Sequence, residues 1–300
     1  MDLPTPGAPV SPITRARPVM KALAPLTGKA RVIGLTGAPG VGKSTVTAAL
    51  VSAYRERDLR VGVLAVDPTS PFSGGALLGD RVRMQDHATD PGVFIRSMAS
   101  RGHLGGLSAA TPQALRVLDA AGFGVVLVET VGVGQAEVEI ASLADTTLVL
   151  AAPGMGDAIQ AAKAGILEIG DIFVVNKRDH PGAQETVRDL RTMIAMARRG
   201  EQDWKPPIVT TVATAGDGIA DLTAAIDAHW SGLDSSGERD RRRRARAREE
   251  VAAIAVAALR QRMGGLPGDS RLDSLAARVA AGELDPYSAA DELVAAASVG

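Results

Sequence analysis

A short glycine-rich segment between two apolar stretches constrains this chain more than any other feature. Gly37–Ser44 reads GAPGVGKS, which fits the pattern G-x-x-x-x-G-K-S/T. Arg31–Leu35 before it is typical of a short buried strand, and Ser44–Tyr54 after it has the apolar periodicity of a helix. In such a strand–loop–helix unit, backbone N–H groups and the helix N-terminus converge on one place that suits an anion. We therefore predict a phosphate-binding loop at Gly37–Ser44.

Each part of this loop has a distinct expected role. Its glycines let the backbone curl closely around phosphate oxygens. The Lys43 ammonium would reach the terminal phosphates of a nucleotide, and the Ser44 hydroxyl would bind Mg²⁺. The predicted nucleotide-binding residues of this segment are Gly37, Ala38, Pro39, Gly40, Val41, Gly42, Lys43, Ser44 and Thr45.

The composition of the 300-residue chain excludes several kinds of protein. Its net charge is −1, aromatic residues make up 3% of it, and it has no cysteine. The lack of cysteine excludes disulfides and thiolate metal sites, and the few aromatics leave little surface for stacking nucleic-acid bases. No apolar run is long enough to span a membrane, and the N-terminal segment lacks the apolar core of a signal peptide. We expect a cytoplasmic protein.

Apolar runs alternate with helical patterns from Arg31 onward. Most of these runs are continuous and rich in β-branched residues, which is typical of strands covered by helices on both faces. We therefore expect a doubly wound α/β domain with a mainly parallel sheet and its ligand at the carboxyl ends of the strands. The expected strands are Val32–Thr36, Val61–Asp67, Val93–Ser97, Val125–Glu129, Thr147–Ala151, Ile172–Asn176 and Ile208–Val212. Further expected helices are Leu107–Ala121, Asp157–Glu168, Gln184–Ala197 and Gly218–Trp230.

Three regions are expected along the chain. Residues 1–29 are predicted to form a proline-rich tail or a short helix, and residues 30–232 hold the α/β domain. Ser231–Gly237 has the polar composition of a linker. Residues 233–300 have helical patterns but no strand pattern, so we expect a helical arm that packs on the main domain or on a second copy of the chain. The patterns are Ala245–Met263, Asp273–Ala281 and Pro286–Ala297.

The segment Asn176–Asp179 reads NKRD at the end of an apolar run and indicates which nucleotide is bound. Guanine carries two neighbouring donors, N1–H and the N2 amine, and the Asp179 carboxylate can accept both hydrogen bonds. Adenine would leave that carboxylate facing a lone pair, which costs about 1–3 kcal/mol when the group is buried. Asn176 would hold the base-binding loop, and the Lys177 stem would lie on the purine. Backbone N–H groups would meet the guanine oxygen at the end of a further strand, at Thr211, Val212 and Ala213.

Three acidic residues follow expected strands or a glycine-rich loop: Asp67, Asp80 and Glu129. Mg²⁺ prefers hard oxygen ligands and keeps several waters, so carboxylates beside Ser44 would bind the metal directly or through water. Asp80 and Glu129 would support the metal and the attacking water, and Lys43 would stabilise charge on the phosphates. A helix N-cap is the alternative role for a carboxylate at a loop-to-helix junction.

The segment Val131–Gln135, which follows Glu129, reads VGVGQ. The Gln135 side chain would orient an attacking water, and the Gly132 N–H would bind the γ-phosphate. The glycines suggest a segment whose order depends on the γ-phosphate. Arg96 and Arg101 are the candidate arginines for stabilising charge on the phosphates.

Together these motifs resemble the MeaB/ArgK/MMAA family, the G-protein chaperones of adenosylcobalamin-dependent methylmalonyl-CoA mutase. The resemblance implies a homodimeric GTPase of the class that includes signal-recognition-particle (MinD-like) and metal-insertion GTPases. It implies GTP/GDP and Mg²⁺ as ligands and a helical C-terminal dimerisation arm. The segments that carry it lie between about Arg31 and Trp230; they are Gly37–Ser44, Asp67–Ser70, Gly74–Arg81, Arg96–Ser97, Arg101–Gly102, Glu129–Gln135 and Asn176–Asp179.

The resemblance further implies three switch segments, which are Asp67–Asp80, Glu129–Gln135 and Ala152–Gly165. The third would transmit the state of the nucleotide to the mutase, through Met155, Asp157, Gln160 and Lys163. From the residues alone, Met155 would be interpreted as part of a helix core and Lys163 as solvent-exposed. The segment before the phosphate-binding loop is shorter than the family's helical N-terminal extension. This segment departs from the family pattern in the region where the extension makes dimer contacts.

Three other functions are compatible with parts of the sequence. Arg241–Arg248 would suit a nucleic-acid or ribosome-associated GTPase, but acidic residues flank this run and no aromatic residue interleaves it. The ArgK name implies a kinase of amino-acid transport proteins, and the guanine-binding pattern argues against an ATP kinase. A nickel-insertion GTPase would need His or Cys ligands, and the four histidines form no spaced cluster. We therefore expect neither a nucleic acid nor a membrane as partner.

Overall fold

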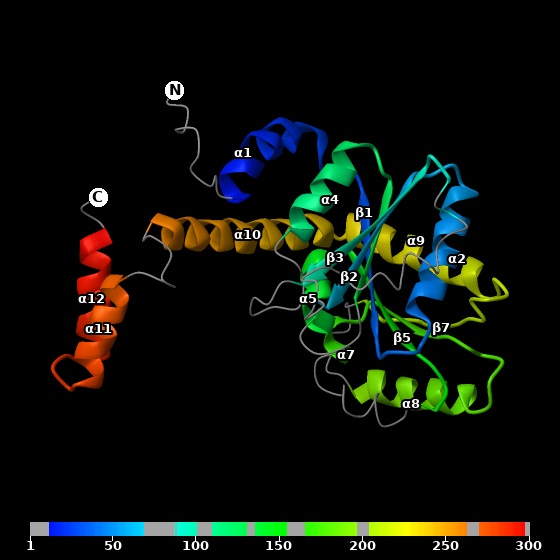
Figure 1. Cartoon of the computed structure of the whole chain (residues 1–300). Helices are drawn as coiled ribbons and strands as arrows, with labels where there is room; N and C mark the ends of the chain where they lie inside the picture. The colour runs from blue at the N-terminus through cyan, green and yellow to red at the C-terminus, as the bar shows by residue number, and fades with distance from the viewer. Residues whose placement is uncertain are drawn as a thin grey trace. The chain divides into compact units, whose positions relative to one another are not determined.

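The computed structural model of the chain describes residues 12–68, 87, 89–100, 110–130, 136–154, 166–196, 204–262 and 270–297. Within these residues, seven strands form one sheet in the order β3-β2-β4-β1-β5-β6-β7, and every neighbouring pair is parallel (Figure 1). The expected α/β fold with a parallel sheet is confirmed. The strands are β1 Arg31–Gly37, β2 Val61–Pro68, β3 Val93–Ser100, β4 Val125–Thr130, β5 Thr146–Ala151, β6 Ile172–Val175 and β7 Ile208–Thr210.

Helices cover both faces of this sheet, so the inner strands β4, β5 and β6 are buried along their whole length. This burial explains why their sequences are continuous apolar runs instead of alternating ones. One face carries α2 (Lys43–Arg55) and α9 (Ile219–Ser235). The other face carries α4 (Thr111–Ala120), α5 (Ala136–Leu143) and α8 (Ala183–Met196), and the short helix α7 (Ile166–Ile169) precedes β6.

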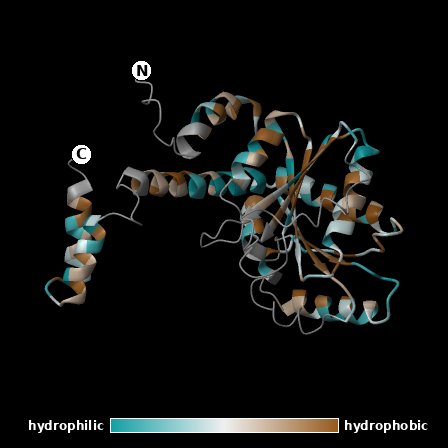
Figure 2. Cartoon of the chain, viewed as in Figure 1, coloured by the Kyte–Doolittle hydropathy of each residue, from teal (hydrophilic) through white to brown (hydrophobic). Residues whose placement is uncertain are grey.

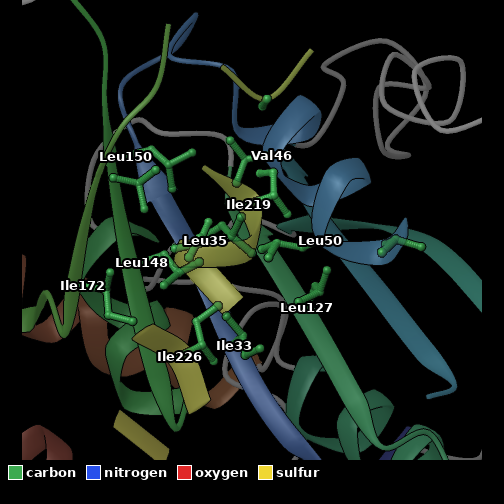
Figure 3. Packing of buried hydrophobic residues seen from close by; sticks show 14 of the residues in the cluster. Ile33, Leu35, Val46, Leu50, Leu127, Leu148, Leu150, Ile172, Ile219 and Ile226 are labelled. Atoms are coloured by element: carbon green, nitrogen blue, oxygen red, sulfur yellow. The ribbon is translucent and has the colours of Figure 1, made fainter. Parts of the chain in front are cut away.

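Residues of the central strand β1 face the two sides of the sheet in alternation. Ile33 and Leu35 belong to the apolar cluster under α2 and α9, together with Leu50 (Figure 3). Gly34, between them, faces α5: a Cβ at this position would lie 2.7 Å from Cγ1 of Ile140. Glycine at this position therefore allows α5 to lie close to the middle of the sheet.

Helix α8 has the pattern of a half-buried helix. Its buried residues recur every three or four positions, as an amphipathic helix requires: Ala183, Thr186, Val187 and Leu190. In Figure 2 the strands are mostly brown, and α8 alternates between brown and teal. In the described residues, no helix combines the length and the hydrophobicity that a membrane span requires.

The chain divides into two compact units. The first is Val19–Arg242, and the second comprises Met1–Pro18 and Arg243–Gly300. In the second unit, α11 and α12 pack through a small apolar cluster around Leu275 and Leu293, and Arg278 pairs with Glu292 at 2.8 Å. The remaining helices are α1 Pro12–Leu23, the 3-10 helix η1 Ala24–Leu26, α10 Glu238–Arg262, α11 Ser270–Ala280 and α12 Pro286–Ala297.

The predicted linker at Ser231–Gly237 is wrong at its start, because α9 continues through Ser235. Inside this helix the Ser231 Oγ donates to the backbone oxygen of Asp227 at 2.9 Å. A serine hydroxyl satisfied in this way is tolerated in a helix, so the polar composition does not end it. The helix ends before Gly237, whose φ of 69° favours glycine, and α10 follows immediately.

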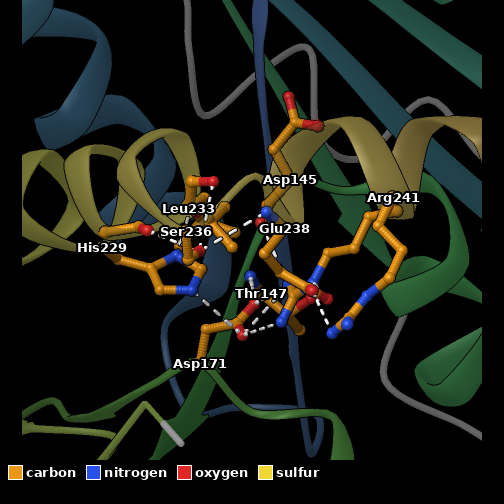
Figure 4. Close-up of polar contacts among 11 residues, drawn as sticks. Asp145, Thr147, Asp171, His229, Leu233, Ser236, Glu238 and Arg241 are labelled. Carbon is orange, nitrogen blue, oxygen red and sulfur yellow. Dashed lines mark hydrogen bonds and ion pairs between the residues drawn. The ribbon is translucent and has the colours of Figure 1, made fainter. Parts of the chain in front are cut away.

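A buried polar cluster lies at the amino ends of β5 and β6 (Figure 4). The Asp171 carboxylate accepts a hydrogen bond from the Thr147 N–H at 2.8 Å, and its Oδ1 lies 3.2 Å from Nη2 of Arg242 in α10. Nε2 of the buried His229 lies 3.3 Å from the same Oδ1, while its Nδ1 lies 2.9 Å from the Thr146 hydroxyl. Burial alone would raise the pKa of Asp171, but His229, Arg242 and the Thr147 N–H outweigh burial and hold that pKa below its ordinary value.

Candidate active site

The loop that follows β1 leaves the sheet at its centre. β1 pairs with β4 on one side and β5 on the other, and α2 begins directly after the loop, at Lys43. In the strand registers, Glu129 of β4 lies opposite Leu35 of β1 and opposite Ala65 of β2. Glu129 therefore reaches the loop from the neighbouring strand, at the carboxyl edge where a parallel sheet binds its ligand.

Two glycines of the loop occupy positions where no side chain fits. Gly37 has a φ of 140°, and a Cβ on it would lie 2.3 Å from the backbone oxygen of Leu150. Gly42, just before α2, has a φ of 94°, and its Cβ would lie 2.4 Å from Nδ2 of Asn176. The positive φ and the close contact each select glycine. The result is a close-fitting backbone loop at a helix N-terminus, which fits a phosphate group.

Lys43 folds back over this loop. Its side chain is buried, and Nζ donates hydrogen bonds to the backbone oxygens of Gly37 at 2.8 Å and Ala38 at 3.1 Å. These bonds fix a positive charge beside the glycines. A fixed charge at this place suits the β- and γ-phosphates of a nucleotide.

Two hydroxyls of α2 meet the Glu129 carboxylate. Ser44 Oγ donates to Oε1 at 2.7 Å, and Thr47 Oγ1 lies 2.9 Å from Oε2. The Ser44 hydroxyl and the Glu129 carboxylate are hard oxygen donors, which are the ligands that Mg²⁺ prefers. Among the residues that the structure describes, no three His, Cys, Asp or Glu side chains gather as a metal site. A hydroxyl and a carboxylate at this place fit Mg²⁺, which is held by few protein ligands and keeps several waters.

Asn176 holds the loop Asn176–Asp179, which is predicted to bind the base, against two other segments. Its Nδ2 donates to the backbone oxygen of Val41 at 2.9 Å, which lies in the phosphate-binding loop. Its Oδ1 accepts hydrogen bonds from the Thr211 hydroxyl at 3.0 Å and from the Ala213 N–H at 3.2 Å. Both lone pairs of the amide oxygen and one of its N–H donors are thus used inside the protein.

The segment that follows β7 has its own backbone hydrogen bonds. The Thr211 N–H donates to the backbone oxygen of Val175 at 2.9 Å, and the Val212 N–H donates to that of Asp217 at 3.0 Å. With the Ala213 N–H on Asn176, all three N–H groups have partners within the protein. These residues hold Asn176, and their contact with a guanine oxygen stays a prediction.

Lys177 and Asp179 lie at the surface of the same loop. Lys177 has a φ of 58°, which is uncommon for a residue with a side chain, and its Nζ donates to the backbone oxygen of Gly40 at 2.9 Å. The loop is therefore bonded to the phosphate-binding loop twice, through Asn176 and Lys177. The Asp179 side chain is 55% exposed, and its Oδ2 lies 3.9 Å from Nε2 of His180. Its carboxylate is accessible to a base.

Other predicted site residues lie outside the described residues. They are Asp80, Arg101, Gly132, Gln135, Met155, Asp157, Gln160 and Lys163. Asp67 lies in β2 with its backbone opposite Ala99 of β3, although its side chain is outside the described part. Arg96 is exposed on β3. The metal, water and switch roles of these residues stay predictions.

Thr47 was not predicted as a site residue, although a signal for it exists. Ser44 and Thr47 are three positions apart on α2, so their side chains share one face of the helix. A carboxylate that reaches one of these hydroxyls can reach the other. Two hydroxyls with this spacing at the start of a helix after a phosphate-binding loop therefore predict a common partner.

The parallel sheet, the glycine loop before α2 and the Asn176 loop bonded to it define a P-loop nucleotide-binding protein. The family model described as Methylmalonyl Co-A mutase-associated GTPase MeaB matches residues 10–266, and the chain belongs to this family. The protein is a GTPase that binds guanine nucleotides.

Known proteins similar to this chain agree with the family. PH0274 of Pyrococcus horikoshii, a relative classed among the GTPases, is 49% identical over 280 residues, which are 93% of this chain and 88% of that protein. The mitochondrial methylmalonic aciduria type A homolog of Caenorhabditis elegans is 33% identical over 214 residues, 70% of this chain and 54% of that protein. The crystal structure of a LAO/AO transport system kinase has a TM-score of 0.68 at 27% identity and covers 95% of this chain and 88% of its own.

Proposed function

We propose that this GTPase couples Mg²⁺-dependent GTP hydrolysis to the assembly or protection of an adenosylcobalamin-dependent methylmalonyl-CoA mutase. The observation that carries the proposal is the pairing of Ser44 with Glu129 beside a glycine loop, in a family whose description names that mutase. The homology to a methylmalonic aciduria type A protein supports the same partner.

Each residue of the phosphate side has a role in this proposal. The loop Gly37–Ser44 would bind the phosphates, and Lys43 would stabilise the negative charge that develops on them. Ser44, Glu129, Asp67 and Asp80 would hold Mg²⁺, which supplies positive charge at the phosphate oxygens. Gln135 would orient the attacking water, and the Gly132 N–H would bind the γ-phosphate. In such a site, hydrolysis depends on positioning and electrostatic stabilisation.

Guanine specificity rests on Asp179 in this proposal. The carboxylate is an acceptor with no donor, so it matches the paired donors of guanine and mismatches the N1 lone pair of adenine. Its location on a loop bonded to the phosphate-binding loop through Asn176 and Lys177 supports this role. Calorimetric titration with GTP and ATP tests it, and equal affinities would contradict it.

The coupling to the mutase requires that the partner distinguishes the two nucleotide states. A cycle can be driven only by a difference in affinity between the GTP-bound and the GDP-bound protein. We expect the mutase to bind with at least about tenfold different affinity in the presence of a non-hydrolysable GTP analogue and of GDP. Calorimetry or surface plasmon resonance measures both affinities, and identical values would remove the proposed cycle.

A pair of lysine variants makes that experiment specific. Lys163, which the family resemblance assigns to the switch toward the partner, is changed to Ala, and Lys205 is changed to Ala as the control. Lys205 is exposed and lies before β7. We expect Lys163→Ala to reduce the difference between the two nucleotide states, while Lys205→Ala leaves it unchanged. Both variants should retain GTP binding.

A homodimer formed through the C-terminal unit is part of the proposal. Val251 and Ile254 are exposed on α10 and share one face, because they are three positions apart. Large apolar side chains grouped on a surface are typical of an interaction site. Light scattering should give twice the mass of the chain, and Ile254→Glu should give the monomer. Val256→Glu, two positions further on and therefore on the opposite side of α10, is the matched control, because Val256 is also exposed.

The nucleic-acid and kinase alternatives have less support. Arg241 pairs with Glu238, and Arg242 pairs with Asp171 at 3.2 Å, so part of the basic run is engaged in ion pairs within the protein. A nucleic-acid function predicts salt-dependent retention of RNA on a filter, and we expect none. A kinase activity is named for a protein of similar structure, the LAO/AO transport system kinase. A kinase would require transfer of phosphate to a protein acceptor, which a radiolabelled transfer assay would detect.

A further inference from the structure

The buried Glu129 carboxylate has two oxygens, and the two have different partners on α2. Oε1 accepts the Ser44 hydroxyl hydrogen at 2.7 Å, and Oε2 lies 2.9 Å from the Thr47 hydroxyl. Glu129 is 4% exposed, so little water is available to replace a lost donor. A carboxylate in such surroundings depends on hydrogen bonds from the protein.

We propose that Thr47 is a positioning residue that orients Glu129, and through Glu129 the Ser44 hydroxyl, at the magnesium side of the nucleotide site. The inference rests on the proposed Mg²⁺-dependent function. The terminal torsion of a glutamate is broad, so each hydrogen bond to the carboxylate restricts the orientation of its plane. The Thr47 hydroxyl on Oε2 adds to the restriction that Ser44 makes on Oε1. Ser44 then keeps its hydrogen on Oε1, and its lone pairs keep one direction.

The Thr47 hydroxyl has a second acceptor, which defines the competing interpretation. Its oxygen lies 3.0 Å from the backbone oxygen of Lys43, one turn earlier in α2. A hydroxyl has one hydrogen, so the Lys43 carbonyl and the Glu129 carboxylate compete for it. An ionised carboxylate accepts a stronger hydrogen bond than a neutral carbonyl does, and the carbonyl of a helix residue already has a backbone donor. If the hydrogen went to Lys43 instead, Thr47 would be an ordinary helix residue.

The variants separate these two possibilities. Thr47→Val replaces the hydroxyl by a methyl of similar size, Thr47→Ala removes it without adding bulk, and Thr47→Ser keeps it. Thr186→Val is the matched control, because Thr186 is also buried in a helix and its hydroxyl donates to the carbonyl of Gly182, one turn earlier, at 3.2 Å. This control makes the same threonine-to-valine change at a position that is away from the Glu129 carboxylate.

The readout is binding rather than turnover. Fluorescence of a labelled, non-hydrolysable GTP analogue is titrated with Mg²⁺ on the full-length chain, and analogue affinity is measured again in excess EDTA. For Thr47→Val we expect the Mg²⁺ concentration at half-maximal effect to rise about tenfold, as loss of a charge-assisted hydrogen bond predicts. Affinity in EDTA should change by less than about twofold, since the phosphate-binding loop is unaltered. Thr47→Ser and Thr186→Val should behave as the unaltered chain does.

Several outcomes would overturn the inference. A Mg²⁺ dependence of Thr47→Val equal to that of Thr186→Val would assign the hydroxyl hydrogen to Lys43. Equal losses in Mg²⁺ and in EDTA would show a structural role. If Thr47→Val does not fold by circular dichroism, Thr47→Ala gives the same comparison. The unaltered chain tests the proposed function itself. If its GTP binding does not depend on Mg²⁺, both that function and this inference are rejected. If its binding depends on Mg²⁺ but the Thr47 variants bind as it does, the inference alone is rejected.

Discussion

The Asn176 side chain donates a hydrogen bond to the backbone oxygen of Val41 at 2.9 Å, across 135 positions of sequence. This bond joins the loop predicted to recognise the base to the loop that binds the phosphates. The same side chain accepts hydrogen bonds from Thr211 and Ala213, so three segments meet at one amide. Both halves of the nucleotide site thereby share one buried residue.

Two variants of Asn176 separate its bonds. Asn176→Asp keeps an oxygen for Thr211 and Ala213 but replaces the donor that faces Val41 with a second acceptor. Asn176→Ala removes both the acceptor for Thr211 and Ala213 and the donor to Val41. We expect Asn176→Ala to lower the free energy of unfolding by about 1–3 kcal/mol, because it leaves buried polar groups without their partner. Urea unfolding measures this loss, and calorimetry should show weaker GTP binding for both variants.

Asp179→Asn tests the recognition of guanine. The amide offers one acceptor where the carboxylate offers two, so GTP affinity should fall by about tenfold or more while ATP affinity stays low. The matched control is Asp217→Asn, an exposed aspartate of the neighbouring loop that pairs with Arg178 at 3.7 Å. Calorimetry with both nucleotides measures the effect. If Asp179→Asn binds GTP like the control, another residue reads the base.

Gly42→Ala should abolish tight nucleotide binding. The new Cβ would lie 2.4 Å from Asn176 Nδ2, and the φ of 94° is unfavourable for alanine. Gly216→Ala is the control: its φ is 78°, but a Cβ there would meet nothing within 4 Å, so it measures the backbone strain alone. We expect Gly216→Ala to lower the free energy of unfolding by about 1 kcal/mol and Gly42→Ala to lower it clearly more.

Asp171 should contribute a pH-dependent part of the stability. Its pKa is lowered in the folded protein, so its contribution is fully present above the ordinary aspartate pKa of about 3.9 and is lost as the pH falls through the lower folded value. Asp171→Asn should cost about 2 kcal/mol at pH 7, and the difference from the unaltered chain should shrink below about pH 4.

Urea unfolding between pH 7 and pH 3 measures this profile. Asp221→Asn, an exposed position on α9, is the control and should leave the profile unchanged. A constant difference between Asp171→Asn and the unaltered chain over the whole range would contradict the assignment.

The sheet and the nucleotide loops could be predicted because their signals are local. A strand buried on both faces needs a continuous apolar run, and β4, β5 and β6 have such runs. The phosphate-binding loop is equally local, since Gly37 and Gly42 are selected by backbone conformation and close contact.

The rest depends on contacts between distant segments. His229 gave no sequence signal for its contact with Asp171, because the two residues are brought together only when α9 packs against β5 and β6. The end of α9 was missed because serine and glycine usually indicate a loop, whereas the Ser231 hydroxyl is satisfied within the helix. The spacing of Ser44 and Thr47 indicates a common partner, but no local signal identifies Glu129, which is 82 positions from Thr47, as that partner.

The bonds from Asn176 and Lys177 to the carbonyls of Val41 and Gly40 have a consequence for binding kinetics. The loop Asn176–Asp179, which is predicted to recognise the base, is held in place by the protein's own backbone. The entropy cost of ordering it is therefore met on folding and not on binding of the nucleotide. On this side of the site, association with nucleotide should therefore proceed at a rate set by diffusion and charge, without waiting for a loop to close.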